Sequence, residues 1–494
     1  MAGAWQFLLA GAALAAYLLA LHRENLWTKT IPNNGLLRYL GFFNAERIVL
    51  TSPEALHEVL VTKNYSFPKP ASLRETAGRF LGLGLILSEG NAHKTQRRNM
   101  NPAFAPRQIK ALYPLFWDKA REMVEAITAD EAKSNNGTIE VVKWASRITL
   151  DLIGLAGLGR DFGAIRDEKN ELVQTYNIIF QPSHQARMLH LIESFVPAWV
   201  LNALPIKLNS DIGQAAGSIR ELCRETIAVK QRKLAKKELN DLDILSSAIR
   251  TETFTEHELI DQAMTLLAAG HDTTGSAFTW GVYLLARHCD VQDKLRQEIQ
   301  QRLPPLDAAN ESLICSVDID SMPYLQAVCS EVLRFYAPVP QTLREAAHDT
   351  TIVGQFIPKG ARIIVAPWAT NRDPRIWGPD AHIFNPDRWL CEQQDDDEHS
   401  GDSNKDYGTR SSGGAYSKYG FLSFLHGTRA CIGQGFARAE LACLLAVWVG
   451  SFEFGLQESA LMDEGNLDIK GGLTARPADG LHIKTTKISR RCSH

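Results

Sequence analysis

The chain has 494 residues, of which 45% are hydrophobic and 22% are charged, so it is long enough to bury a large core. Its formal net charge is −3 at pH 7 and its cations form no basic stripe, which argues against nucleic acid as an obligate partner. The eight cysteines form no CxxC pair and no zinc spacing, which is typical of a protein from a reduced compartment.

An apolar run opens the chain. Residues 2–21 contain one strictly polar side chain, Gln6, and as a helix they would be about 30 Å long. We expect residues 1–22 to form an N-terminal membrane anchor; a cleaved signal peptide is the alternative, but no basic segment precedes the run. Only residues 22–30 separate the anchor from residue 31. Either several tens of residues are missing there, or the catalytic domain, residues 31–494, lies close to the bilayer.

Helical patterns dominate the rest of the chain. Apolar positions recur at spacings of three and four in seven segments: 106–134, 141–160, 169–188, 211–239, 256–288, 291–303 and 323–336. Alternating, strand-like runs are short and lie at 47–52, 350–367 and 473–486. We therefore expect a single catalytic domain that is mainly α with small β-sheets.

A basic helix is expected within residues 89–104. His93 and Arg97 are four residues apart and therefore lie on one face of it. For Lys94 and Arg98, a solvated basic face and a surface that docks a partner are equally good interpretations.

A long helix is expected from about residue 256. Thr255 and Glu258 have the spacing of a capping box, and no proline follows before about His288. Residues 269–274, in the middle of this helix, read AGHDTT. An isolated Asp-Thr pair of this kind is most often a solvated carboxylate beside a threonine that bonds its own helix backbone.

Charged residues recur at fixed spacing further along. Glu331 and Arg334 are three residues apart on one face of a helix that the prolines after it end. Arg388 lies in the segment FNPDRW at 384–389. Residues 392–414 are acidic and rich in serine and glycine, so we expect them to be a disordered insert.

The segment most informative about function is FLHGTRACIG at 424–433. Gly427 and Gly433 flank Cys431 and allow a close approach to its backbone. The helix expected after it, together with Arg429, would favour thiolate over thiol, and a thiolate there can bind a metal. Taken alone, a cysteine of this kind is more often a buried structural residue.

In this order along the chain, these motifs resemble those of the cytochrome P450 superfamily, especially its microsomal and fungal members. The resemblance implies a haem b that lies between the long distal helix and the proximal cysteine loop and helix, with the Cys431 thiolate as its axial ligand. It implies that Asp272 and Thr273 supply protons and that Gly270 makes room for dioxygen. It places Glu331, Arg334 and Arg388 in a buried structural triad. The residues it places around the haem are His93, Arg97, Arg344, Phe424, Arg429 and Gly433.

The resemblance also implies a monooxygenase that inserts one atom of O2 into a hydrophobic small molecule, in secondary metabolism for example. No glycine-rich dinucleotide loop is present, so electrons from NADPH would come through a separate cytochrome P450 reductase, with cytochrome b5 as an additional donor. We expect the endoplasmic reticulum membrane with the catalytic domain in the cytosol. The alternatives are a haem-thiolate isomerase or dehydratase, which needs no reductase, and a non-enzymatic haem-binding membrane protein.

Overall fold

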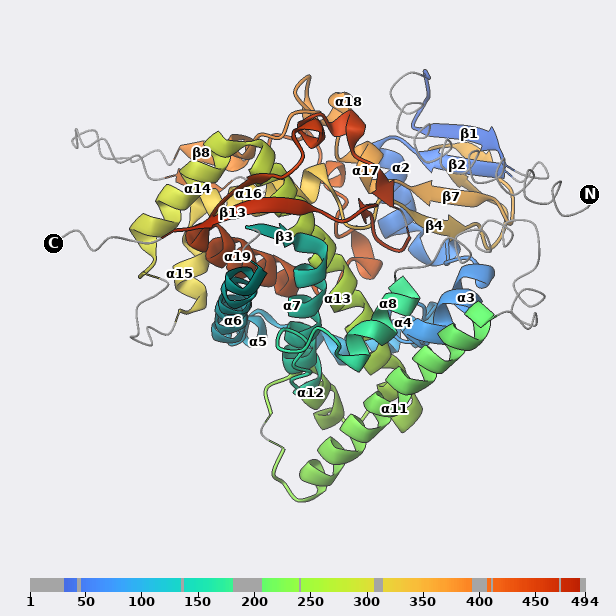
Figure 1. The fold of residues 1–494 in the computed structure, drawn as a ribbon. Helices are drawn as coiled ribbons and strands as arrows, with labels where there is room; N and C mark the ends of the chain where they lie inside the picture. The colour runs from blue at the N-terminus through green and yellow to red at the C-terminus, as the bar shows by residue number, and fades with distance from the viewer. Residues whose placement is uncertain are drawn as a thin grey trace, which may run out of the picture.

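A computed structural model describes residues 31–41, 46–134, 137–180, 207–239, 241–305, 314–392, 407–409, 412–470 and 472–488. Helices make up most of these residues and the strands among them are short, as Figure 1 shows. The predicted mainly α fold with small sheets is therefore confirmed.

The helices follow the predicted periodic segments closely. The longer ones are α3 (Ala71–Leu81), α4 (Gly90–Met100), α6 (Tyr113–Ser134), α7 (Val141–Ile153), α8 (Glu171–Phe180), α11 (Lys207–Ala235), α13 (Glu256–Arg287), α14 (Cys289–Arg302), α16 (Pro323–Phe335) and α19 (Gln434–Ser451). Short helices are α2 (Pro53–His57), α5 (Pro106–Lys110), α12 (Ile244–Arg250), α15 (Ser316–Asp320), α17 (Pro367–Thr370) and α18 (Pro374–Trp377).

The ends of α13 lie where the sequence places them. The Thr255 hydroxyl accepts a hydrogen bond from the Glu258 amide at 3.3 Å, and the Glu258 carboxylate accepts one from the Thr255 amide at 2.9 Å. This reciprocal pair satisfies amides that the first turn of a helix leaves free. His288 is the C-cap, so the predicted capping box and the predicted length are both confirmed.

The largest sheet has four strands in the order β1 (Leu36–Leu40), β2 (Glu46–Leu50), β7 (Arg362–Val365) and β4 (Thr342–Glu345). β2 and β7 are parallel, with Ile48 opposite Ile363, and the other pairs are antiparallel. A second sheet has the order β10 (Phe452–Leu456), β13 (His482–Lys487) and β3 (Thr138–Glu140). The hairpins are β5 (Thr350–Ile352) with β6 (Gln355–Ile357), β8 (Leu390–Glu392) with β9 (Tyr407–Thr409), and β11 (Ile469–Lys470) with β12 (Arg476–Pro477). In Figure 1 the four-stranded sheet lies to one side of the helical mass.

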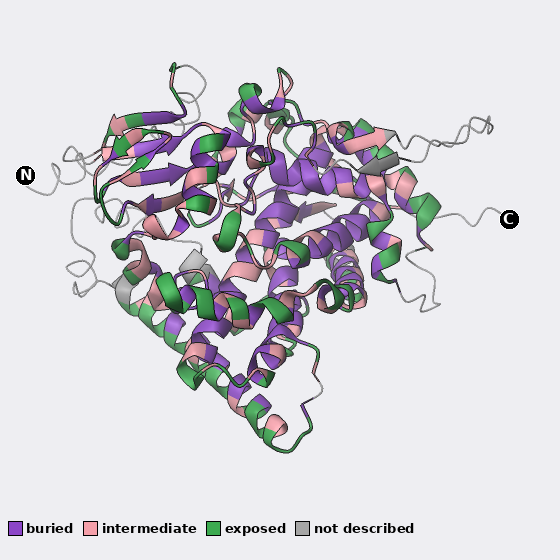
Figure 2. Ribbon diagram, turned by 180° about the vertical axis from the view of Figure 1, so that it is seen from behind, coloured by how far each residue is buried: buried purple, intermediate pink, exposed green. Residues whose placement is uncertain are grey.

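The core is centred on α13, which is buried along most of its length and contacts α7, α11 and α19. Figure 2 shows the buried residues gathered in the central helices, whereas long α11 at the lower edge is exposed on its outer side. Gly270 serves this packing: a Cβ there would lie 2.6 Å from the Ile153 side chain of α7. Gly270 is therefore needed for packing against α7, and its expected role beside dioxygen stays a prediction.

The expected anchor and most of the expected insert lie outside the residues that the structure describes. The anchor expected at 1–22 and the link at 22–30 lie outside the described residues. Within the part of the chain that the structure describes, no helix is both long and apolar enough to cross a membrane. Residues 393–406 of the expected insert also lie outside it, but 407–409 form β9 against β8, so disorder across all of 392–414 is wrong. The pairing with β8 supplies backbone hydrogen bonds that composition alone does not predict.

Candidate functional site

The loop that carries Cys431 is fixed by its own backbone. Gly427 has φ +77°, and a Cβ there would collide with the Leu60 carbonyl oxygen, so glycine is required on both counts. The Cys431 amide donates to the Phe424 carbonyl oxygen at 2.8 Å. Gly433 is the N-cap of α19, and a Cβ on it would lie 3.9 Å from the Cys431 sulfur. The loop therefore presents the sulfur from a tight turn at the start of α19.

The surroundings of the Cys431 thiol differ from those expected. Its side chain is exposed, yet burial among protein atoms raises the pKa of the thiol, while the Gly433 amide and Arg97 lower it by less. The sulfur is therefore accessible although protein atoms surround it. The expectation that Arg429 favours the thiolate is wrong, because Arg97 is the cation that acts on the sulfur and Arg429 is paired with Glu89. A metal bound to the sulfur would supply the positive charge that a buried thiolate needs.

Four cations from different elements surround His93 closely enough to affect its pKa: Lys69 before α3, Arg97 in α4, Arg344 in β4 and Arg429 in the cysteine loop. We call them the cation cluster. Burial, followed by the charges of Arg344 and Arg429, lowers the pKa of Lys69 to about 7. Burial, followed by the charge of Arg429, lowers the pKa of Arg344 to about 10. Burial and then all four cations lower the pKa of His93 to about 4. This part of the protein therefore carries a concentrated positive field.

One carboxylate, that of Glu89, faces this field. It forms an ion pair with Arg429 and accepts a hydrogen bond from the Lys69 amide at 3.0 Å. Among the described residues it is the only carboxylate paired with any of the four cations. The remaining guanidinium bonds go to neutral groups: Arg97 donates to the Ala430 carbonyl oxygen at 2.5 Å, and Arg344 to that of Leu343 at 2.8 Å.

The Arg429 side chain also has unused hydrogen-bonding capacity. Its Nε is buried and has no hydrogen-bond partner among the described residues. A buried guanidinium N–H without an acceptor is costly, and four cations facing one carboxylate are costly as well. An additional anion would satisfy both. A haem, with one iron for Cys431 and two propionates for the cations, fits these residues.

The structure brings Glu331, Arg334 and Arg388 together, and we call them the ion triad. Arg334 donates to both oxygens of Glu331, at 2.8 and 2.7 Å, and Arg388 donates to one of them at 3.1 Å. The Trp389 indole donates to the other at 2.8 Å. Glu331 and Arg334 are both fully buried. The group is stable in the interior because its charges are paired and its polar atoms are bonded.

The ion triad is connected to the cysteine loop through Asn371. Arg334 donates to the Asn371 carbonyl oxygen at 2.8 Å, and the Asn371 side chain donates to the Ser423 hydroxyl at 2.9 Å. The same side chain accepts from the Leu422 amide at 2.8 Å. Because Leu422 and Ser423 directly precede Phe424, these bonds fix the start of the cysteine loop to α16.

Asp272 and Thr273 lie near the middle of α13. The Thr273 hydroxyl donates to the Ala269 carbonyl oxygen at 2.7 Å, the backbone bond typical of a helical threonine. Asp272 is buried, and its carboxylate is bonded to residues of the C-terminal segment rather than to Thr273. The solvated carboxylate that an isolated Asp-Thr pair would suggest is therefore not what the structure shows.

Comparison with known proteins decides the family, because the sequence model described as Cytochrome P450 matches residues 37–478. The chain belongs to the cytochrome P450 family. Cytochrome P450 monooxygenase sphH of Aspergillus fumigatus is 44% identical to it, over 94% of this chain and 83% of the relative. Cytochrome P450 monooxygenase buaD of Petromyces alliaceus is 40% identical, over 91% and 82%. Cytochrome P450 monooxygenase ptmK of Penicillium ochrochloron is 36% identical, over 95% and 88%. This P450 is therefore an oxidoreductase of the monooxygenase type.

Sequence reasoning missed three residues of this P450 site: Lys69, Glu89 and Tyr65. The Tyr65 hydroxyl is 3.1 Å from His93 Nδ1, and its ring lies beneath the Arg429 guanidinium at 5.0 Å. None of the three belongs to one of the motifs by which the sequence analysis placed residues around the haem. Glu89 could have been suspected, because it directly precedes the basic helix that contains His93 and Arg97.

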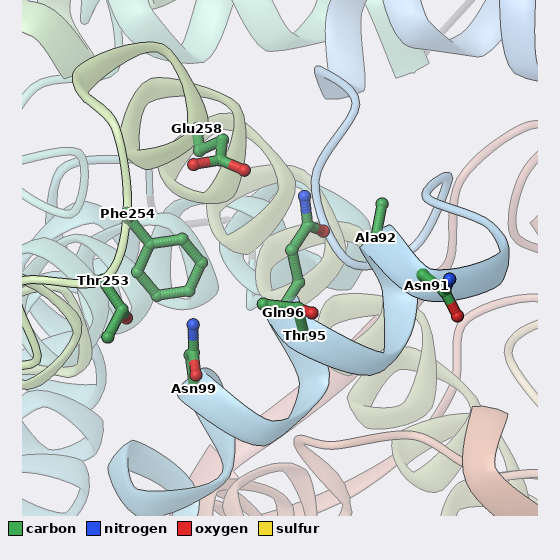
Figure 3. A pocket seen from close by; sticks show the side chains of 8 residues that line it. All are labelled: Asn91, Ala92, Thr95, Gln96, Asn99, Thr253, Phe254 and Glu258. Carbon is green, nitrogen blue, oxygen red and sulfur yellow. The ribbon is translucent and has the colours of Figure 1, made fainter.

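The hollow shown in Figure 3 is a different part of this P450. It has a volume of about 290 Å³ and lies between α4 and the turn before α13. None of the residues expected to contact the haem lines it. Its lining residues are Asn91, Ala92, Thr95, Gln96, Asn99, Thr253, Phe254 and Glu258.

Proposed function

We propose that this P450 binds haem b through the Cys431 thiolate and oxygenates a hydrophobic small molecule. The observation that carries the proposal is the position of Cys431 beside the cation cluster, which has four cations and one paired carboxylate. A haem offers an iron for the sulfur and two carboxylates for the cations. When bound, it supplies the iron that activates dioxygen with two electrons from outside.

The residues around the haem would have distinct tasks. The cation cluster would bind the propionates, with the Nε of Arg429 and the guanidinium of Arg344 as the buried donors. His93, whose low pKa keeps it neutral at pH 7, would donate or accept a hydrogen bond there without adding charge. Phe424 and Gly433 would shape the loop around the sulfur, while the ion triad holds the loop against α16.

Proton supply would come from α13. The Thr273 hydroxyl donates to the Ala269 carbonyl oxygen, so its own oxygen remains free to accept a hydrogen bond at the dioxygen side. Asp272, next to it in the helix, would supply protons to this position. The overall reaction is RH + O2 + 2 e⁻ + 2 H⁺ → ROH + H2O, or the corresponding epoxidation of a double bond.

The electrons would come from NADPH through a separate cytochrome P450 reductase, with cytochrome b5 as a second donor. We propose that residues 1–22 anchor the chain in the endoplasmic reticulum membrane with the catalytic domain, residues 31–494, in the cytosol. The fungal relatives support a substrate from secondary metabolism, such as a hydrophobic natural product or a fatty-acid-like compound. Lys94 and Arg98, both exposed on α4, are candidates for the reductase contact.

Replacing Cys431 tests the proposal. Cys431→Ser should abolish the red-shifted ferrous carbon monoxide spectrum that thiolate ligation produces, because an alcohol does not replace the thiolate as a ligand. Cys289→Ser, which changes an exposed cysteine remote in sequence from the loop, is the matched control and should keep that spectrum. Retention of the spectrum by Cys431→Ser would contradict the ligand assignment. Product formation without NADPH would instead favour the isomerase or dehydratase class.

A further inference from the structure

A segment near the C-terminus is bonded to one face of α13. We call residues 472–477 the strap. The Ser276 hydroxyl and the Trp280 indole both donate to the Ala475 carbonyl oxygen, at 2.7 and 2.8 Å. On its other side, the Ala475 amide donates to the Pro338 carbonyl oxygen at 2.9 Å. The strap is therefore held between α13 and the segment that follows α16.

Asp272 lies on this same face of α13, because Asp272, Ser276 and Trp280 are spaced four residues apart. The Thr474 hydroxyl donates to Asp272 Oδ2 at 2.5 Å, and Arg476 Nη1 lies 3.5 Å from Asp272 Oδ1. Both oxygens of the carboxylate therefore contact the strap. Asp272 and Thr474 are buried, and the Arg476 side chain is 12% exposed.

The strap residues themselves are fixed in place. Arg476 is in β12, opposite Lys470 of β11, so its backbone is set by a hairpin. Ala475 is almost completely buried. A hydroxyl and a guanidinium on such a fixed segment can set both the rotamer of a carboxylate and its charge environment.

These contacts bear on proton supply because the Asp272 carboxylate is committed to the strap and not to Thr273, whose hydroxyl bonds its own helix. We propose that Thr474 and Arg476 are positioning residues that hold the Asp272 carboxylate in the orientation from which it supplies protons. The inference rests on the role of Asp272 in the proposed function. Thr474 would set the direction of Oδ2, and Arg476 would keep a positive charge beside Oδ1.

The test uses the full-length haem-loaded protein with a cytochrome P450 reductase and NADPH, and dodecanoic acid as the hydrophobic probe. Hydrogen peroxide formed per NADPH consumed is measured between pH 6 and pH 9 for Thr474→Val, Thr474→Ser, Arg476→Gln, Arg476→Lys and Asp272→Asn. A hydrogen bond to a carboxylate changes an equilibrium by about tenfold. Thr474→Val and Arg476→Gln should therefore raise the peroxide yield by about that factor and alter its pH profile. Thr474→Ser and Arg476→Lys should restore most of the coupling, because each keeps a donor.

Ser276→Ala is the matched control, because it removes one bond between the strap and α13 without touching Asp272. Amide hydrogen exchange of residues 472–477 in the resting protein should increase in Ser276→Ala about as much as in Thr474→Val, since each loses one hydrogen bond. Of these two variants, only Thr474→Val should form more hydrogen peroxide per NADPH consumed.

Three results would overturn the inference. Equal uncoupling in Ser276→Ala and Thr474→Val would show that rigidity of the strap is what matters, not contact with Asp272. Wild-type coupling in Thr474→Val and Arg476→Gln, with uncoupling in Asp272→Asn, would refute the positioning role and leave the proposed function intact. Wild-type coupling in Asp272→Asn would remove Asp272 from proton supply, and the inference would fail with that part of the proposed function.

Discussion

Two buried groups of charge in this P450 differ in how completely they are partnered. In the ion triad, both oxygens of Glu331 are bonded, and Arg334 donates to Glu331 and to three backbone carbonyls. In the cation cluster, four cations share one paired carboxylate, and a buried guanidinium N–H has no acceptor among the described residues. The difference separates two roles. A complete group stabilises the fold, whereas an incomplete one lowers stability until an anion binds.

The largest expected effect comes from breaking the complete group. Glu331→Ala leaves the buried Arg334 without its carboxylate and leaves Arg388 with Asp380 alone, which should lower the free energy of unfolding by about 3–5 kcal/mol. Chemical denaturation of the apoprotein measures it. The control is Lys294→Ala, which breaks a half-exposed ion pair with Asp387 and should change stability by less than about 1 kcal/mol. Similar losses in the two variants would mean that the triad is not a special structural element.

Removing a charge from the cation cluster should not lower the stability of the apoprotein, in contrast to removing one from the ion triad. Arg344→Met removes a buried cation that no carboxylate of the described residues pairs with, so the apoprotein should be as stable as the wild type or more stable by about 1 kcal/mol. Haem affinity should fall by about tenfold, because a charged donor to a propionate is lost. Denaturation of the apoprotein and titration with haem measure the two quantities. A large loss of apoprotein stability would place Arg344 with the structural charges instead.

A smaller effect is expected in the pH dependence of the apoprotein. Burial and the neighbouring arginines lower the pKa of Lys69 to about 7, whereas in the unfolded chain it is near 10.5. Between these values the unfolded chain binds more protons, so this lysine makes stability rise as pH increases from about 7 to about 10.5. Lys69→Met should flatten that rise. Haem should flatten it as well, because propionates raise the pKa of Lys69. Denaturation midpoints of the wild-type and Lys69→Met apoproteins at pH 7, 8 and 9 test this prediction. Parallel pH profiles of the two apoproteins would contradict it.

Some features could be predicted from the sequence because they depend on short-range spacing. Glu331 and Arg334 are one helical turn apart. Thr255 and Glu258 have the spacing of a capping box, which predicts that a helix begins after Thr255. Lys69 and Thr474 could not be found in this way, because they reach the site from elements distant in sequence. The packing role of Gly270 could not be predicted for a related reason: the sequence does not show that Ile153 of α7 occupies the space beside it.

The most direct test of the account compares haem with its dimethyl ester, in which both propionates are uncharged while the iron and the ring are kept. Apoprotein of the wild type and of Arg344→Met is titrated with each, and the dissociation constants are measured from the absorption of the bound form. We expect the wild type to bind haem at least about tenfold more tightly than the ester, and Arg344→Met to lose most of this preference while binding the ester as the wild type does. Equal affinity of the wild type for haem and ester would contradict the claim that the cation cluster is completed by the carboxylates of the haem.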